Sequence, residues 1–292
     1  MTLGHHYTNH PYKSKMKSAS LLDLLALLAP ESTKTTLRSW IKLGRVTVDK
    51  EVITQASFLV EEGREVQLLP KPRFTDKGGI KILYQDRFLV VVDKPEGVLS
   101  VKAPFEHEKT LHKYLKATFG PNVKVVHRLD QGTSGVILFA FEEKTYKALK
   151  KLFEKHDVKR RYLAVLEGSL QEEKGTWESY LYEDEAYVVH SSPRPVEKSR
   201  LATTHYTVIN KSKHYTLVEC SLDTGRKNQI RVHASDCGHP VTGDSKYGAQ
   251  KDPLSRLALH AYSLEFLHPM LKKKMRFESP VPESFLKFFK NG

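Results

Sequence analysis

Two polar, basic segments of the sequence, the first of them rich in glycine, carry side chains that a folded core does not require. The first, residues 127–135, places Arg128 and Asp130 between two apolar stretches. The second, residues 224–233, contains Arg226, Lys227 and Arg231 and lies about a hundred residues later. Binding and catalytic groups concentrate on such loops when a rigid scaffold holds them. Taken alone, the first loop is as compatible with a purely structural connection, in which Arg128 and Asp130 form a surface salt bridge, as with a functional site. The presence of two such loops is therefore the informative observation.

The spacings of several common catalytic sites are missing. The sequence has no phosphate-binding P-loop, no Gly-x-Gly-x-x-Gly after a strand and no His-Glu-x-x-His. Cys220 and Cys237 are too few for a disulfide scaffold and lack the paired spacing of a zinc site. His127, His233 and His260 have no acidic or thiolate partner at ligand spacing, so we expect hydrogen-bonded, structural histidines. We therefore predict no metal, no cofactor and a reducing compartment, the cytoplasm.

Basic side chains outnumber acidic ones. The 292 residues contain 47 Lys and Arg against 34 Asp and Glu, a formal net charge of +13. Such a surplus suits a polyanionic partner such as a nucleic acid, although a charged surface that keeps the protein soluble is the simpler alternative. No apolar run approaches the ~20 residues that cross a bilayer. We expect no membrane partner, and nothing in the sequence demands a protein partner.

A row of basic residues follows one face of a predicted helix near the N-terminus. This helix is expected to begin after Ser32 as its N-cap and to end at Gly44. No acidic residue interrupts the row, which favours contact with phosphates over an ordinary solvated face. The row consists of Lys34, Arg38, Lys42 and Arg45.

Length and composition predict two domains, at roughly 100–200 residues per domain. We expect a flexible tail over 1–17, a small α/β domain over 18–70, a linker over 71–79 and a larger domain over 80–292. The small domain contains a helix through Leu28, the basic helix, and short strands at 46–48, 52–53 and 65–69.

Adjacent strands with occasional helices predict an α+β fold with a mixed, largely antiparallel sheet for the larger domain. Expected strands lie at 80–84, 88–92, 123–129, 136–141, 161–166, 203–209, 214–222 and 257–266, with a hairpin over 177–190. Expected helices lie at 110–119, 143–156 and 282–289.

The small domain resembles the RNA-binding domain named after ribosomal small-subunit protein four. The resemblance spans about fifty residues and depends on the pattern Leu37-x-x-Trp40-Ile41-x-x-Gly44-Arg45-Val46-x-Val48. The Asn-Gly turn usual in that domain is replaced by Asp49-Lys50.

The larger domain resembles the RluA-type family of RNA pseudouridine synthases, which isomerise uridine to pseudouridine. Five ordered motifs carry the resemblance: Lys94-Pro95-x-Gly97, His127-Arg128-Leu129-Asp130-x-x-Thr133-Ser134-Gly135, Arg160-x-Tyr162-x-Ala164, Thr224-Gly225-Arg226 with Gln229-Ile230-Arg231-Val232-His233, and Arg256-Leu257-Ala258-Leu259-His260-Ala261. Two positions depart from the pattern: Asn228, where many relatives have His, and Arg160, where Lys is common.

The resemblance implies a fold, a reaction and roles for five residues. Asp130 is the implied nucleophile, attacking either the sugar C1′ or the base. Arg231 would keep this carboxylate ionised and aimed, and Tyr162 would stack on the target base and assist proton transfer at C5. Ile230 would form an apolar pocket wall, and Arg128 would hold a phosphate or replace the flipped base.

These residues favour an enzyme that modifies ribosomal or transfer RNA. A catalytically inactive RNA-binding or ribosome-assembly protein on the same fold is the alternative, but it has no need of an ionised carboxylate in a pocket. A hydrolase that uses Asp130 would want a second carboxylate, and no motif offers one.

Overall fold

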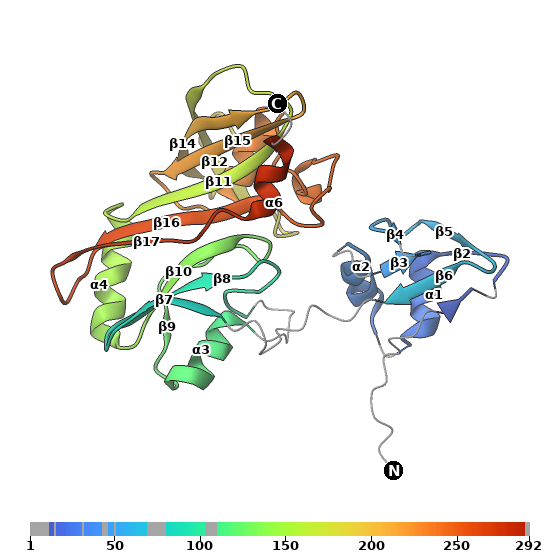
Figure 1. The fold of residues 1–292 in the computed structure, drawn as a ribbon, viewed down its shortest axis with the longest axis horizontal. Helices are drawn as coiled ribbons and strands as arrows, with labels where there is room; N and C mark the ends of the chain where they lie inside the picture. The colour runs from blue at the N-terminus through green and yellow to red at the C-terminus, as the bar shows by residue number, and fades with distance from the viewer. Residues whose placement is uncertain are drawn as a thin grey trace, which may run out of the picture. The chain divides into compact units, whose positions relative to one another are not determined.

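The computed structural model describes residues 12–14, 16–30, 32–42, 46–49, 51–68, 80–102 and 110–289, apart from the side chains of residues 39, 42 and 52. The chain divides into two compact units, residues 1–75 and 76–292. Figure 1 shows the elements of each unit. The linker predicted at 71–79 lies outside the described residues.

The first unit packs two helices against short strands. Its described elements are β1 (Tyr12–Lys13), β2 (Ser18–Ser20), α1 (Leu21–Leu28), α2 (Lys34–Lys42), β3 (Val46–Val48), β4 (Glu51–Val52), β5 (Leu59–Glu61) and β6 (Glu65–Leu68). The strands form one sheet of order β1-β6-β3-β4 and a separate β2-β5 pair. The buried leucines of α1 join Leu37 and Ile41 of α2 and Val46 and Val48 of β3 in one apolar cluster. The predicted α/β organisation is therefore present.

Local capping sets where the two helices begin. Ser20 Oγ accepts a hydrogen bond from the backbone N–H of Asp23 at 3.2 Å, which satisfies one of the free donors at the start of α1. Thr33 Oγ1 does the same for the N–H of Thr36 at 3.2 Å at the start of α2. The prediction of Ser32 as the cap of α2 was wrong by one residue, because Thr33 provides the hydroxyl.

The predicted flexible tail extends too far into the chain. Tyr12 pairs with Val66 and Lys13 with Glu65 in an antiparallel bridge between β1 and β6. Ser14 is buried, and its N–H donates to the carbonyl of Arg64 at 2.9 Å. The exposed edge of β6 accounts for this ordering, because unpaired backbone groups at a sheet edge take up an available strand. Residues 12–14 therefore belong to the first unit.

The second unit is built around one large sheet. Its strands are β7 (Lys81–Gln85), β8 (Leu89–Lys94), β9 (Lys124–Val125), β10 (Ser134–Ala140), β11 (Lys159–Glu167), β12 (Lys174–Glu183), β13 (Val189–Ser192), β14 (Arg200–Lys211), β15 (Tyr215–Leu222), β16 (Leu259–Leu267) and β17 (Lys274–Glu278). Its helices are α3 (Leu111–Phe119), α4 (Glu143–Glu154), α5 (Gln229–Asp236) and α6 (Glu283–Leu286), with short 3-10 turns η2 (Ser245–Tyr247) and η3 (Lys287–Phe289).

The sheet is mixed and largely antiparallel, as predicted. Its strand order is β13-β12-β14-β15-β11-β16-β10-β8-β7, with β17 paired to β16 and β9 to β10. The β10–β16 pair is parallel, whereas the other pairs are antiparallel among the described strands. Helix α4 packs on β9 and β10, and α5 packs on β12, β13 and β14. Figure 1 shows β16 between β11 and β17, with α4 near the β7–β10 part of the sheet.

Three local predictions for this unit need correction. The strand expected over 123–129 covers Lys124–Val125 alone, because Ser100 Oγ takes the place of a ladder partner: it donates to Leu129 O at 2.8 Å and accepts from Leu129 N at 3.1 Å. Strand β17 and helix α5 were not among the expected elements. Helix α5 is short, and its buried residues include the polar Gln229 and His233, which obscure an apolar helical period.

The parallel pair depends on one glycine. Gly135 has φ +109°, and a Cβ at this position would lie 2.2 Å from the backbone oxygen of Ala261 on β16. Only glycine accommodates both the left-handed backbone and this close approach. Gly135 therefore sets how closely β10, which directly follows the loop with Asp130, meets β16.

We predict that Gly135→Ala strongly destabilises the protein, because the backbone of Ala261 must move to make room for the added Cβ. The free energy of unfolding in urea should fall by about 4 kcal/mol or more. Gly120→Ala is the matched control: Gly120 has φ +98° but no atom within 4 Å of the added Cβ, so the loss should be about 1 kcal/mol. Equal losses in the two variants would show that the close approach to Ala261 carries no energetic weight.

Candidate active site

The loop that carries Asp130 is fixed on both sides of this residue. Leu129 is held by Ser100 Oγ, and the carbonyl of Asp130 accepts from the N–H of Thr133 at 3.1 Å. The carbonyl of Gln131 accepts from Nζ of Lys94 at 3.1 Å. The Asp130 side chain keeps 24% of its surface exposed, so a fixed backbone presents a carboxylate that an incoming molecule can reach.

Lys94 supports this loop from inside the protein. Its side chain is fully buried, and Nζ donates to three carbonyl oxygens, of Pro95 at 3.0 Å, Val98 at 2.7 Å and Gln131. Burial lowers the pKa of Lys94 to about 7, and the nearby charge of Asp130 opposes this shift. Lys94 was recognised in a sequence motif without a role, and the structure shows that it joins the turn after β8 to the Asp130 loop.

Arg231, in the first turn of α5, divides its guanidinium between two carboxylates. Nη1 donates to Asp130 Oδ2 at 3.3 Å. Nε and Nη2 bind the two oxygens of Asp244 at 2.6 and 2.7 Å, a bidentate pair. Burial works against the charge, but the hydrogen bonds and charges of Asp244 and Asp130 raise the pKa of Arg231. The structure therefore brings Asp130 and Arg231 together, as the sequence predicted, and adds Asp244 as the residue that orients the arginine.

An amide and a phenol complete the surroundings of Arg231. Asn228 Oδ1 accepts from Arg231 Nη1 at 3.1 Å, and its Nδ2 donates to the Tyr247 hydroxyl at 2.8 Å. The Tyr247 ring lies under the guanidinium, 4.9 Å from ring centroid to Cζ. Asn228 has φ +55°, a conformation that asparagine tolerates better than most residues. Asn228, which departs from the usual motif, is therefore a direct hydrogen-bond partner of Arg231.

Gln229 fixes the start of α5. Its side-chain oxygen accepts from Thr224 Oγ1 at 2.7 Å and from the N–H of Arg226 at 3.0 Å. Its side-chain nitrogen donates to Thr203 O at 3.0 Å and Thr204 Oγ1 at 2.9 Å. All four hydrogen-bonding sites of this buried amide are used, so Arg231, two residues later, starts from a fixed backbone.

Tyr162 lies close enough to Asp130 for the carboxylate to affect the pKa of its phenol. The residue follows a register shift in the pairing of β11 with β16, where it opposes Ala261. Burial, and secondarily the Asp130 carboxylate, raise the pKa of Tyr162 above its ordinary value of 10.0, while Arg160 opposes the shift. Tyr162 therefore remains a neutral phenol at physiological pH.

The other two predicted substrate-binding residues differ in exposure. Arg128 is exposed, and no hydrogen bond or ion pair holds its guanidinium within the part of the chain that the structure describes. No described acidic residue therefore forms the local salt bridge that was the alternative for Arg128.

Ile230 is 4% exposed and belongs to the main apolar cluster, against which Tyr162 also packs. Its contacts favour a core position behind the site.

The three motif histidines are held by hydrogen bonds. His127 Nε2 accepts from the N–H of Leu138 at 3.1 Å, and burial lowers the pKa of His127 to about 3. Burial also lowers the pKa of His233 to about 4, and that of His260. Across the described residues, no group of three or more His, Cys, Asp or Glu side chains is placed to hold a metal ion.

The predicted basic row lies partly within the description. Lys34 and Arg38 are exposed on α2, while Leu37 and Ile41 on the other face are fully buried. Lys42 is the last residue of α2, but its side chain lies outside the described residues, as does all of Arg45. The helix therefore exposes at least the first half of the row.

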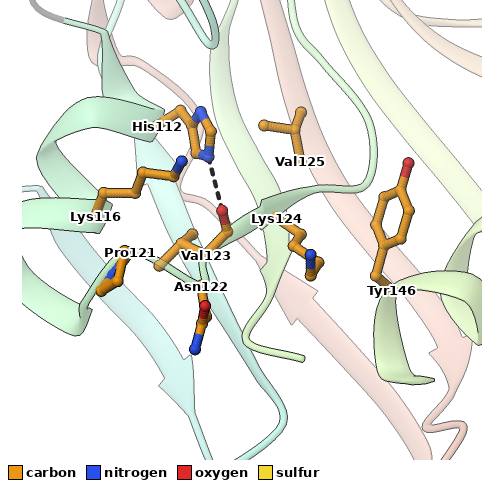
Figure 2. Close-up of a pocket in the computed structure, with 8 residues that line it drawn as sticks. All are labelled: His112, Lys116, Pro121, Asn122, Val123, Lys124, Val125 and Tyr146. Atoms are coloured by element: carbon orange, nitrogen blue, oxygen red, sulfur yellow. Dashed lines mark hydrogen bonds between the residues drawn. The ribbon is translucent and has the colours of Figure 1, made fainter. Parts of the chain in front are cut away.

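A surface hollow elsewhere in the second unit is separate from these residues. Figure 2 shows His112 and Lys116 of α3, residues 121–125 and Tyr146 of α4 around it. Strand β9 beside this hollow pairs with Phe139 and Ala140, at the end of β10, whereas Asp130 precedes its beginning. The length of β10 puts the hollow roughly 20 Å from the Asp130 loop, and Lys124 in it is already paired with Glu143 at 2.9 Å.

Family models and relatives agree on what the chain resembles. A model of RNA pseudouridylate synthases matches residues 88–236, and an S4-domain model matches residues 21–66. The chain belongs to the RNA pseudouridine synthase family. The motif-based recognition of this family and of the S4-type domain is thus confirmed.

Several relatives span nearly the whole chain. An uncharacterised RNA pseudouridine synthase of Bacillus subtilis, YlyB, is 31% identical over 95% of each chain. Ribosomal large subunit pseudouridine synthase D of Nitrosomonas europaea is 32% identical over 89% of this chain and 80% of its own. The solved structure of the human protein named RNA Pseudouridylate Synthase Domain Containing 1 has a TM-score of 0.59 at 27% identity, covering 69% of this chain and 83% of the other.

No described helix is long and apolar enough to span a membrane.

We predict a pH-dependent stability that comes from His127. Its pKa is about 3 in the folded protein and about 6.5 in the unfolded chain, so the unfolded chain binds more protons between these values. The free energy of unfolding therefore falls as the pH falls through this window, by about 1 kcal/mol for His127 between pH 6 and pH 5.

His127→Gln keeps an acceptor near the N–H of Leu138 but does not titrate. Urea unfolding of both proteins at pH 6 and pH 5 should show a smaller loss in the variant, by about 1 kcal/mol. The same loss in both proteins would mean that His127 is not buried in its neutral form.

Proposed function

We propose that this protein isomerises specific uridines of ribosomal or transfer RNA to pseudouridine, with Asp130 as the nucleophile. The observation that carries the proposal is the Asp130 carboxylate, exposed at one side and paired at 3.3 Å with Arg231, which Asp244 holds in turn. The positive charge of Arg231 lies directly beside the carboxylate that would act as the nucleophile. It also aims the carboxylate at whatever base enters beside it.

The isomerisation needs no external oxidant or reductant. The bond between the sugar C1′ and N1 breaks, a bond between C1′ and C5 forms, C5 loses a proton and N1 gains one. Asp130 supplies the electron pair that forms a temporary bond, either to C1′ or to the base, and recovers it when C1′ is joined to C5. A pocket that keeps the detached base close to the sugar is the remaining requirement.

We assign the holding of the base to Tyr162. The ring is partly buried against the core, and its raised pKa keeps it a neutral phenol. A flat, uncharged ring suits stacking against uracil. The proton transfer at C5 that the family resemblance also implies would require loss of the phenol proton, which burial opposes, so stacking is the role that the site favours.

The remaining site residues are assigned to binding. Arg128, exposed and without a described partner, is free to hold a phosphate or to occupy the space that the flipped base leaves. Ile230 would support the apolar side of the base pocket from the core. Exposed Lys34 and Arg38, with Lys42 and Arg45, would contact RNA phosphates from the S4-type domain.

The proposal also includes a substrate RNA and a cellular compartment. Large-subunit ribosomal RNA is the first substrate to test, because four relatives of this chain are named ribosomal large subunit pseudouridine synthase D. We place the protein in the cytoplasm, where such RNA is modified and where both of its cysteines, which are free, would stay reduced.

We predict that Asp130→Asn abolishes turnover and leaves the fold and RNA binding intact. Asparagine has nearly the same shape and keeps one acceptor oxygen, but it lacks the charge and the nucleophilicity. Arg231→Lys is the matched comparison, since lysine keeps the positive charge without the planar fork. Its activity should fall, but not to zero. The measurement is pseudouridine formed per enzyme on unmodified large-subunit ribosomal RNA, with circular dichroism and RNA binding on the same preparations.

Wild-type turnover by folded Asp130→Asn would refute the nucleophile. An absence of pseudouridine with the wild-type protein on both ribosomal and transfer RNA would instead contradict the proposed reaction and favour an RNA-binding protein.

A further inference from the structure

The hairpin that joins β12 to β13 ends in a tyrosine at a position that normally favours glycine. Asp184 N donates to Val188 O at 2.9 Å, and Tyr187 N donates to Asp184 O at 3.0 Å, which closes a three-residue loop. In such loops the last residue is left-handed and is usually glycine. Here it is Tyr187, with φ +60°.

Folding gives no reason for a tyrosine at this position. The residue is 57% exposed, so its ring gains little from burial. Its backbone conformation is unfavourable for a residue with a bulky side chain. A side chain kept exposed on a strained backbone points to a function.

The hairpin is attached directly to the Arg231 site. Val189 N donates to the Tyr247 hydroxyl at 3.3 Å, and Val189 packs with Val232 and Tyr247 in a buried cluster. The same Tyr247 hydroxyl accepts from Asn228, which binds Arg231. The position of Tyr187 is therefore fixed relative to Asp130.

Two lysines contact Tyr187. The backbone carbonyl of Tyr187 accepts from Lys227 Nζ at 3.1 Å and from Lys246 Nζ at 3.2 Å. Lys227 Nζ also lies 5.6 Å from the centre of the Tyr187 ring and pairs with Glu183. Exposed aromatic rings combined with cations are how proteins bind single-stranded nucleic acid, because every base has a face that stacks and every phosphate has a charge.

We propose that Tyr187 is a stacking platform for an RNA base that flanks the target uridine, with Lys227 and Lys246 beside the adjoining phosphates. The inference rests on the proposed function, because it requires an RNA substrate. An enzyme that extrudes one base must separate it from its neighbours. A ring fixed beside the site replaces part of the stacking that such a neighbour loses.

The test compares three variants of the full chain. Tyr187→Gly removes the ring and relieves the backbone, Tyr187→Phe keeps the ring, and His156→Gly relieves an exposed residue of similar conformation, φ +61°, at the end of α4. The probes are the dissociation constant for a fluorescently labelled ten-nucleotide oligouridylate, KM and kcat on large-subunit ribosomal RNA, and the urea midpoint.

We expect Tyr187→Gly to weaken oligouridylate binding and to raise KM by roughly tenfold, the usual scale of one lost stacking contact. Its kcat should stay within about twofold of wild type, and its urea midpoint should equal or exceed that of wild type. Tyr187→Phe and His156→Gly should bind RNA as the wild type does.

Wild-type binding by Tyr187→Gly would overturn the proposal, as would an equal loss of binding in His156→Gly. Failure of the proposed function has a different signature. If the wild-type protein makes no pseudouridine, the oligouridylate arm still reports whether Tyr187 contacts RNA.

Discussion

A single guanidinium links the parts of the chain that form the candidate active site. Arg231 is 14% exposed, and it is bound by Asp244, Asp130 and Asn228. A buried charge of this kind is tolerated only while its partners are in place, because leaving one charge unpaired is strongly unfavourable. The Asp130 loop, the start of α5 and the turn that carries Asp244 must therefore keep one arrangement.

The rest of the second unit holds these segments in that arrangement. Gly135 lets β10 approach β16, which places the Asp130 loop beside the strand that pairs with Tyr162. Nζ of the buried Lys94 donates to the backbone carbonyl of Gln131 in this loop. Gln229 fixes the helix that carries Arg231. The hydrogen bonds of the Lys94 and Gln229 side chains go to backbone groups and threonine hydroxyls, so none of them engages the Asp130 carboxylate.

The sequence was most informative where a motif carries its own chemistry. The family resemblance of two motifs about a hundred residues apart implied that Arg231 lies beside Asp130. The strands of the large sheet followed from their apolar patterns. Asp244 was assigned no role, because spacing alone does not show which acid reaches an arginine thirteen residues earlier. Lys94 likewise sits in a motif, yet its three carbonyl partners come from turns whose path only the folded backbone defines.

Local signals misled where another part of the chain decides the outcome. Tyr12 and Lys13 look like a polar tail, but the free edge of β6 pairs with them. Residues 126–129 were expected to continue the strand that includes Val125, but Ser100 takes the backbone hydrogen bonds of Leu129. The conformation of Tyr187 was equally hidden, because residues that tolerate a left-handed backbone are easily recognised and tyrosine is not one of them.

Asp244 and Arg231 act as one unit that presents Asp130, and a double-mutant cycle on turnover measures whether they do. Pseudouridine formation would be measured for Asp244→Asn, Arg231→Lys and the double variant, each shown by circular dichroism to be folded. The double variant should be about as impaired as the worse single variant, because either change already releases the guanidinium fork. Losses that multiply in the double variant, or wild-type turnover by Asp244→Asn, would contradict it.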